Sequence, residues 1–165
     1  MILRKPFLDF SSRASRLQFW VAVAIVAPAL MALMLTFFVY ALSIPGAYEN
    51  GGPTPSPKGP LGLSITVVWL IAIAALLLYF LAAAVRRLHD LGKAWWWIFI
   101  FLIVPDLMFD YGRYLVDSSM GATGQMPFIL LLYPAMALWF WGFVELGFFH
   151  GTSGANRFGP DPLAN

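Results

Sequence analysis

The chain has 165 residues, of which 61% are apolar and only 11% are charged, and its mean hydropathy of +0.78 excludes an ordinary water-soluble domain. Cysteine is absent and histidine occurs twice, which excludes disulfides and thiolate chemistry and leaves little for a metal, so we expect no metal and no cofactor. The net charge of +2 does not indicate a nucleic-acid partner, because the basic residues lie beside apolar runs, where they orient a chain in a membrane.

Two long apolar runs occupy the first half of the chain. After an interfacial segment at residues 1–18, the run at 19–42 exceeds the roughly 7–15 residues of a signal peptide's apolar core, so it predicts a retained first transmembrane helix. Residues 43–60 are rich in glycine and proline and predict an outer loop. The uncharged run at 61–85 predicts a second span, and residues 86–93 predict a cytoplasmic turn.

The third apolar run is too short to cross a bilayer by itself. As a helix, its uncharged stretch at 94–105 would reach only about 18 Å, against about 30 Å of hydrocarbon. A helix over 94–115 is long enough only if it carries Asp106 into the outer half of the membrane; the alternative is a re-entrant segment. The remaining segments are an outer loop at 116–125, a fourth span at 126–149 and a cytoplasmic tail at 150–165.

Basic residues gather on one side of these four spans. Eight of the ten lie in the segments 1–18, 86–93 and 150–165, and the other two are Lys58 and Arg113. The positive-inside rule then predicts that both termini are cytoplasmic. The expected fold class is an all-α polytopic membrane protein, a single membrane domain with four transmembrane helices.

Three polar segments, residues 10–20, 85–97 and 154–162, fall on the predicted cytoplasmic face. Their basic and aromatic residues converge at one membrane interface, which is the pattern of a surface that binds anionic lipid or a partner protein. The candidate residues of this surface are Arg13, Arg16, Arg86, Arg87, His89, Asp90, Lys93, Trp95, Asn156, Arg157 and Asp161.

The first polar segment predicts a helix start. Ser11 or Ser12 would cap a helix whose next turns carry Arg13 and Arg16 on one face, three residues apart. Such a pair serves as an interfacial anchor, or alternatively holds a lipid phosphate or an acidic side chain of a partner.

The second polar segment holds the candidate catalytic residues. Gly92 is expected to take the left-handed conformation that ends a helix. His89 beside Asp90 suits a proton acceptor with its carboxylate, and the alternative is a hydrogen-bonded structural histidine. Trp95 begins a run of three tryptophans that indicates an interfacial belt, with a stacking site as the second interpretation.

The third polar segment lies in the tail, where repeated glycine and proline favour tight turns rather than disorder. We expect this tail to fold back onto the helices. Asn156, Arg157 and Asp161 would then hydrogen-bond to the other two polar segments.

Two acidic residues are predicted inside the membrane. Glu145 lies about one helical turn before the end of the fourth span, where an unpaired carboxylate is costly, so we expect an ion pair with an arginine. Asp106 either extends toward the outer interface or lines a polar cavity.

The three polar segments resemble the motifs of a known family, the bacterial inner-membrane proteins grouped as domain of unknown function 805. Residues 86–93, followed by tryptophans, resemble its most recognisable stretch, 13–20 its opening motif and 156–162 its closing motif. The resemblance covers nearly the whole chain and implies a multi-pass protein of the bacterial inner membrane without an established activity. The long loop at 43–60 and the polar region at 106–125 depart from the usual pattern of the family and suggest a partner particular to this chain.

Three functions are compatible with these residues. The leading hypothesis is a non-enzymatic accessory or structural subunit that binds anionic phospholipid, a larger membrane protein complex or further copies of itself. The second is a transporter or channel component for a small solute or ion, with Asp106, Glu145 and His89 as polar stations. The third is an enzyme acting on lipid headgroups, with His89 as base and Asp90 as its partner, although no nucleophile or metal set accompanies them.

Overall fold

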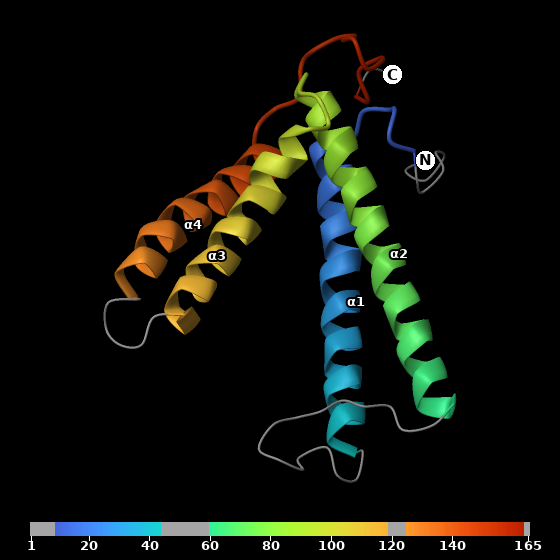
Figure 1. The fold of residues 1–165 in the computed structure, drawn as a ribbon. Helices are drawn as coiled ribbons and strands as arrows, with labels where there is room; N and C mark the ends of the chain where they lie inside the picture. Colours follow the sequence, from blue (N-terminus) through green and yellow to red (C-terminus); the bar gives the residue numbers. More distant parts are fainter. Residues whose placement is uncertain (1–8, 44–59, 119–124, 164–165) are drawn as a thin grey trace. The chain divides into compact units, whose positions relative to one another are not determined.

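The computed structural model describes residues 9–43, 60–118 and 125–163, and the regular secondary structure of this part of the chain is helical. No strand occurs within it, apart from an isolated bridge between Asn156 and Gly159 in the tail. The all-α expectation is therefore confirmed for these residues. The elements are α1 (Arg16–Ser43), α2 (Pro60–Asp90), the π-helical segment η1 (Phe99–Ile103), α3 (Val104–Ser118) and α4 (Gln125–Gly147) (Figure 1).

Three helices are long and apolar enough to cross a membrane. Their outer faces expose large apolar side chains, which is the pattern of helices surrounded by lipid rather than water. The membrane character expected from composition is thus supported at three of the four predicted spans, and α3 is the shorter, more polar exception. The three candidate spans are Arg16–Tyr40, Gly62–Asp90 and Met126–Gly147.

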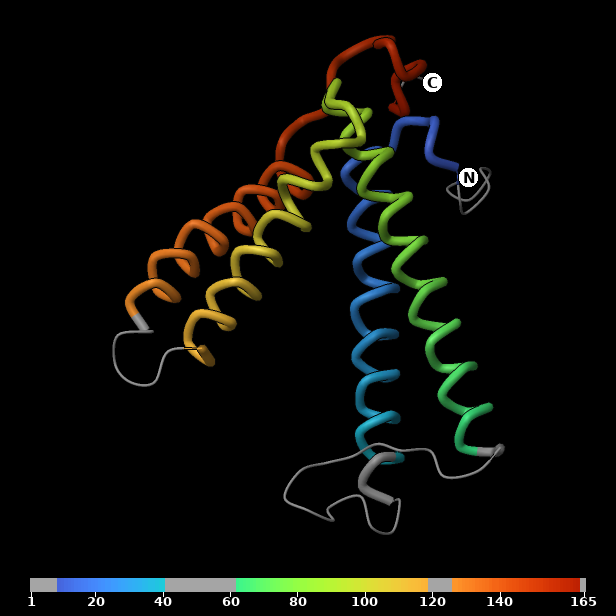
Figure 2. Tube along the Cα trace, viewed as in Figure 1, coloured from blue at the N-terminus to red at the C-terminus, as the bar shows by residue number. Residues whose placement is uncertain are grey.

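The chain divides into two compact units, and the smaller one, Val21–Ala82, is a pair of helices. Within it α1 and α2 lie side by side (Figures 1 and 2). The indole of Trp69 on α2 donates its N–H to the carbonyl of Leu33 on α1 at 2.8 Å and stacks on Phe37, with 4.4 Å between ring centroids. An indole N–H in an apolar environment needs such an acceptor, so this contact helps to fix the register of the pair.

The larger unit, Met1–Trp20 with Ala83–Asn165, contains a second pair in which α3 and α4 lie side by side (Figure 2). Small residues allow this close approach. A β-carbon on Gly112 would lie 2.9 Å from the ring of Phe128, and one on Gly142 would lie 2.7 Å from Phe101. Both glycines therefore serve packing.

The segment predicted as the third span is helical but irregular. In η1 the N–H of Val104 donates to the carbonyl of Phe99, one residue further back than in an α-helix. Pro105 follows directly, and it has no N–H to continue the regular ladder. The π-turn lets the helix pass this proline and continue as α3, which carries Asp106 in its first turn.

The predicted capping residue of the first helix is wrong. The helix begins at Arg16, so Ser15, and not Ser11 or Ser12, is the capping residue. The Ser15 hydroxyl accepts from the N–H of Gln18 at 3.4 Å, and the Gln18 side chain accepts from the N–H of Ser15 at 2.9 Å. This reciprocal capping box leaves Arg13 outside the helix, so Arg13 and Arg16 do not share a helix face.

The second helix extends further than its apolar run. It continues through Asp90 instead of ending at 85, so the first residues of the predicted 86–93 turn are helical. Gly92 has φ +73°, and the N–H groups of Gly92 and Lys93 donate to the carbonyls of His89 and Leu88 at 3.1 and 2.8 Å. This is a Schellman motif, so the predicted role of Gly92 is confirmed.

Candidate functional site

Asp90 lies at the centre of a buried polar cluster, in which its two carboxylate oxygens are held by two different arginines. Oδ1 accepts from Nε of Arg13 at 3.0 Å, and Oδ2 accepts from the guanidinium of Arg87. The side chains are 1% exposed for Arg13, 0% for Arg87 and 5% for Asp90. Two of the three family-like segments are thus joined by ion pairs that water does not reach.

The two arginines carry one more charge than Asp90 neutralises, and backbone carbonyls accept their remaining N–H groups. Arg87 donates to the carbonyls of Leu146 and Phe149, at the end of α4. A cation there complements the negative end of the helix dipole and satisfies carbonyls that lack helical partners. Arg13 donates to the carbonyls of Thr152 and Gly154 in the tail. The cluster, defined as Arg13, Arg87 and Asp90, therefore ties the amino-terminal segment, α2, α4 and the tail together.

Close backbone approach at Gly151 completes the cluster. A β-carbon on Gly151 would lie 2.0 Å from Oδ2 of Asp90, so only glycine fits there. The next residue, Thr152, donates both its N–H and its hydroxyl to the carbonyl of Asp90, at 2.8 and 3.0 Å. Neither residue was among the sequence candidates. The signal that was available is a glycine followed by a hydroxyl residue at a helix end, which is common in loops.

The tail folds back onto the end of α2, as its turn residues predicted. Asn156 donates to the carbonyl of His89 at 2.9 Å, and Arg157 donates to the carbonyl of Gly92 at 3.1 Å. Asp161 instead accepts from the N–H groups of Gly154 and Leu163, within the tail itself. These two amide donors favour the ionised form and lower the pKa of Asp161 below its ordinary value.

His89 is packed under the tail rather than paired with its neighbour. Its ring stacks on Phe158, with centroids 3.9 Å apart and an interplanar angle of 5°. In the described part of the chain its buried Nδ1 has no hydrogen-bond partner, and both oxygens of Asp90 are taken by arginines. The hypothesised pairing of His89 with Asp90 is therefore not formed.

Glu145 forms an ion pair, but with a lysine rather than the arginine that we expected. Nζ of Lys93 lies 2.7 Å from Oε1 of Glu145, and Trp141 donates its indole N–H to Oε2 at 3.0 Å. The same ammonium lies 4.3 Å from the ring centroid of Trp97 and 5.8 Å from that of Trp141. Arg87 already donates to Asp90 and to the carbonyl of Leu146 on α4, so Lys93 supplies the positive charge that pairs with Glu145.

The predicted surface residues differ in accessibility. Arg13, Arg87, His89 and Asp90 are buried, so the structure does not offer their charges to a lipid or a partner. The half-buried candidates are Arg86, Lys93, Asn156 and Asp161. The exposed candidates are Arg16, Trp95 and Arg157. The transporter hypothesis needs Asp106, Glu145 and His89 along one polar path. These residues do not share one environment, because Asp106 is exposed while Glu145 and His89 are buried.

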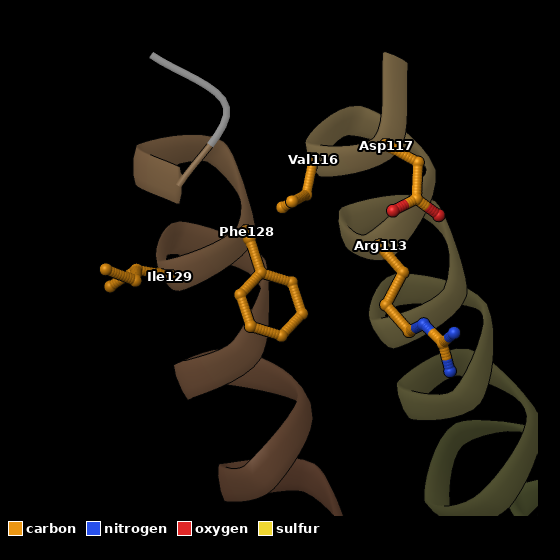
Figure 3. Close-up of a pocket in the computed structure, with 5 residues that line it drawn as sticks. All are labelled: Arg113, Val116, Asp117, Phe128 and Ile129. Carbon is orange, nitrogen blue, oxygen red and sulfur yellow. The ribbon is translucent and has the colours of Figure 1, made fainter. Parts of the chain in front are cut away.

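A shallow pocket lies at the other end of the same unit, between the end of α3 and the start of α4 (Figure 3). It has a volume of about 410 Å³ and is lined by Arg113, Val116, Asp117, Phe128 and Ile129. Val116 points toward Phe128, while Arg113 and Asp117 follow one another along α3 (Figure 3). In the sequence, Arg113 is one of two basic residues on the predicted outer side, and it lies three residues after Asp110, with which it could pair on one helix face.

Comparison with known proteins supports the family resemblance. Neither a curated protein nor a solved structure matches the chain. One family model, described as a protein of unknown function (DUF805), matches residues 7–160 and so includes all three polar segments. Because this match spans nearly the whole chain, the protein belongs to the DUF805 family of proteins of unknown function.

Proposed function

We propose that this protein is a four-span, non-enzymatic accessory protein of the bacterial inner membrane, with both termini cytoplasmic, and that its cytoplasmic end binds anionic phospholipid. The observation that carries the proposal is the division of the motif charges, since Arg13, Arg87 and Asp90 are buried in ion pairs while Arg16 and Arg157 remain exposed. These three buried residues hold segments of this chain together and so form a structural scaffold.

The cations that remain at the surface of this scaffold support lipid binding. Arg16 is exposed at the start of α1, and Arg157 lies over the ring of Phe158, 4.6 Å from its centroid. Trp95 is exposed in the same unit, and tryptophan favours the level of lipid headgroups. Each basic residue near an anionic membrane surface contributes about 1 kcal/mol of binding, so two such cations give a measurable preference.

The lipid part of the proposal is tested by native mass spectrometry of the protein extracted in mild detergent. We expect phosphatidylglycerol to remain bound in preference to phosphatidylcholine. The Arg16→Gln/Arg157→Gln double variant should lose about 2 kcal/mol of binding, close to a thirtyfold weaker affinity. The matched control, Lys58→Gln/Arg113→Gln, removes the same charge from the predicted outer side and should retain the lipid. Equal retention of both lipids by the parent protein would refute lipid binding.

The topology is tested separately by thiol labelling. Because the chain has no cysteine, each single variant carries one thiol and the parent protein is the unlabelled control. Single variants Thr54→Cys and Ser153→Cys place one thiol in the predicted outer loop and one in the tail. A membrane-impermeant maleimide added to intact cells should label the first and not the second. Labelling of Ser153→Cys in intact cells would overturn the proposed orientation.

A further inference from the structure

The charged residues of α3 form one narrow stripe. Asp106, Asp110, Arg113 and Asp117 follow one another at intervals of four, three and four residues. At about 100° per residue they occupy only about 60° of the helix circumference. All four are exposed, and none takes part in an ion pair within the residues that the structure describes.

The rest of the helix surface is apolar. On one side of the stripe, the buried residues Pro105 and Gly112 mark the face packed against α4. On the other side, Leu107, Tyr111 and Tyr114 are exposed. An amphipathic helix lying on a membrane has a broad polar face, whereas a narrow stripe between apolar faces is typical of a helix that meets one polar neighbour in an apolar environment.

The stripe has an excess of negative charge that the chain's own spans cannot balance. Within the predicted span 94–115, Asp106 and Asp110 against Arg113 leave one negative charge, and Asp117 adds another just beyond the outer end of the span. The apolar runs at 19–42 and 61–85 hold no charged residue, and the charge in the fourth span is Glu145, which is itself acidic and already paired with Lys93. Charged side chains inside a membrane are paired or lie in water, so the cation that is missing within the span comes from elsewhere.

A second copy of this chain does not supply them. Copies in one membrane with the same orientation are related by an axis along the membrane normal, so equivalent residues of two paired α3 helices meet at equal depth. Asp106 would then face Asp106, and Asp110 would face Asp110. Like charges at that distance repel, which disfavours this pairing.

From this complementarity we infer that the stripe of Asp106, Asp110, Arg113 and Asp117 is a docking face for a transmembrane helix of another protein, one that carries at least one basic residue within its apolar segment. The inference rests on the proposed membrane location of α3. It adds the place and the chemistry of the partner contact.

Two neighbouring positions allow a matched photo-crosslinking test. Ile103 is seven residues before Asp110 and lies on the stripe side, while Val104 is seven residues before Tyr111 and lies on the apolar side. Their exposed fractions are similar, at 43% and 38%. Replacing each in turn with p-benzoylphenylalanine leaves the acids intact and probes two directions at one depth.

We expect irradiation of native membranes to give a crosslink to a different protein from position 103 and not from 104. Sequencing of the crosslinked peptide should show Lys or Arg within an apolar run. The yield should fall at least fivefold with Asp106→Asn/Asp110→Asn and remain unchanged with Leu107→Ala. A product of twice the chain mass, a peptide without basic residues, or a yield insensitive to the Asn variants overturns the inference.

The membrane location is read out independently with the single variant Leu107→Cys. If an aqueous maleimide labels this thiol in native membranes, α3 is outside the lipid, and the proposed third span fails together with the inference. If the thiol is protected and no crosslink forms at 103, the span stands and the docking face is refuted.

Discussion

The carboxylate of Asp90 occupies the space that a side chain on Gly151 would need, since a β-carbon there would lie 2.0 Å from Oδ2. These residues belong to different segments of the chain, the end of α2 and the loop after α4. Their contact allows the tail to pass directly over the buried ion pairs, and it makes Gly151 as necessary to the cluster as the charged residues.

The variant Gly151→Ala should therefore unfold more readily. Its methyl group must displace Asp90, which weakens the contacts to Arg13 and Arg87 and costs about 3 kcal/mol. Gly154→Ala is the comparison, because its β-carbon meets nothing but φ is +75°, a strain of about 1–2 kcal/mol. Thermal unfolding in detergent, followed by size-exclusion chromatography, should rank Gly151→Ala below Gly154→Ala. Equal unfolding temperatures would contradict the close approach.

Removal of the shared carboxylate should cost more than removal of one arginine. Asp90→Asn leaves two buried guanidinium groups without a counter-charge, at a cost of about 3–5 kcal/mol. Arg13→Gln leaves the Arg87–Asp90 pair neutral and should be milder. The same unfolding assay checks this order, and a larger effect of Arg13→Gln would mean that the tail carbonyls, rather than Asp90, are the main partners of Arg13.

Lys93 and Glu145 should be energetically coupled. Their side chains are 24% and 11% exposed, so the 2.7 Å ion pair is only partly screened by solvent. A double-mutant cycle with Lys93→Met and Glu145→Gln should give about 1–2 kcal/mol of coupling. Trp97→Leu should weaken the site in both the parent and the Glu145→Gln background, because the ammonium also lies over that ring. A coupling of zero would show that the pair does not form in the membrane.

Asp161 should titrate below the 3.8 of an unperturbed aspartate, since the N–H groups of Leu163 and Gly154 favour its ionised form. With a lowered pKa in the folded protein, its contribution to holding the tail is complete above about pH 4 and is lost as the pH falls through that lowered pKa. Carbon NMR of aspartate-labelled protein measures the titration directly, with Asp161→Asn to assign the signal. A midpoint at or above 3.8 would contradict the two hydrogen bonds.

The sequence predicts the structure of this protein best where a local property decides it. The apolar runs predicted helices because a chain in lipid must satisfy its backbone within each segment, and three of them are long and apolar enough to span. Gly92 was assigned correctly because a Schellman motif needs a left-handed residue. The three motifs indicated the DUF805 family. The predicted cap at Ser11 or Ser12 was wrong, because the reciprocal hydrogen bonds between Ser15 and Gln18 decide where the helix begins.

Only the tertiary structure decided which charges meet. Arg13 and Asp90 are 77 residues apart, and nothing in their local sequence distinguishes a buried partner from a surface cation such as Arg16. The choice of Lys93 for Glu145, and the need for glycine at 151, likewise depend on where α2, α4 and the tail come together. The sequence alone thus determined the helices and the membrane character through hydrophobicity, a property of each segment. Ion pairing depends on distances between segments, and these exist only once the chain is folded.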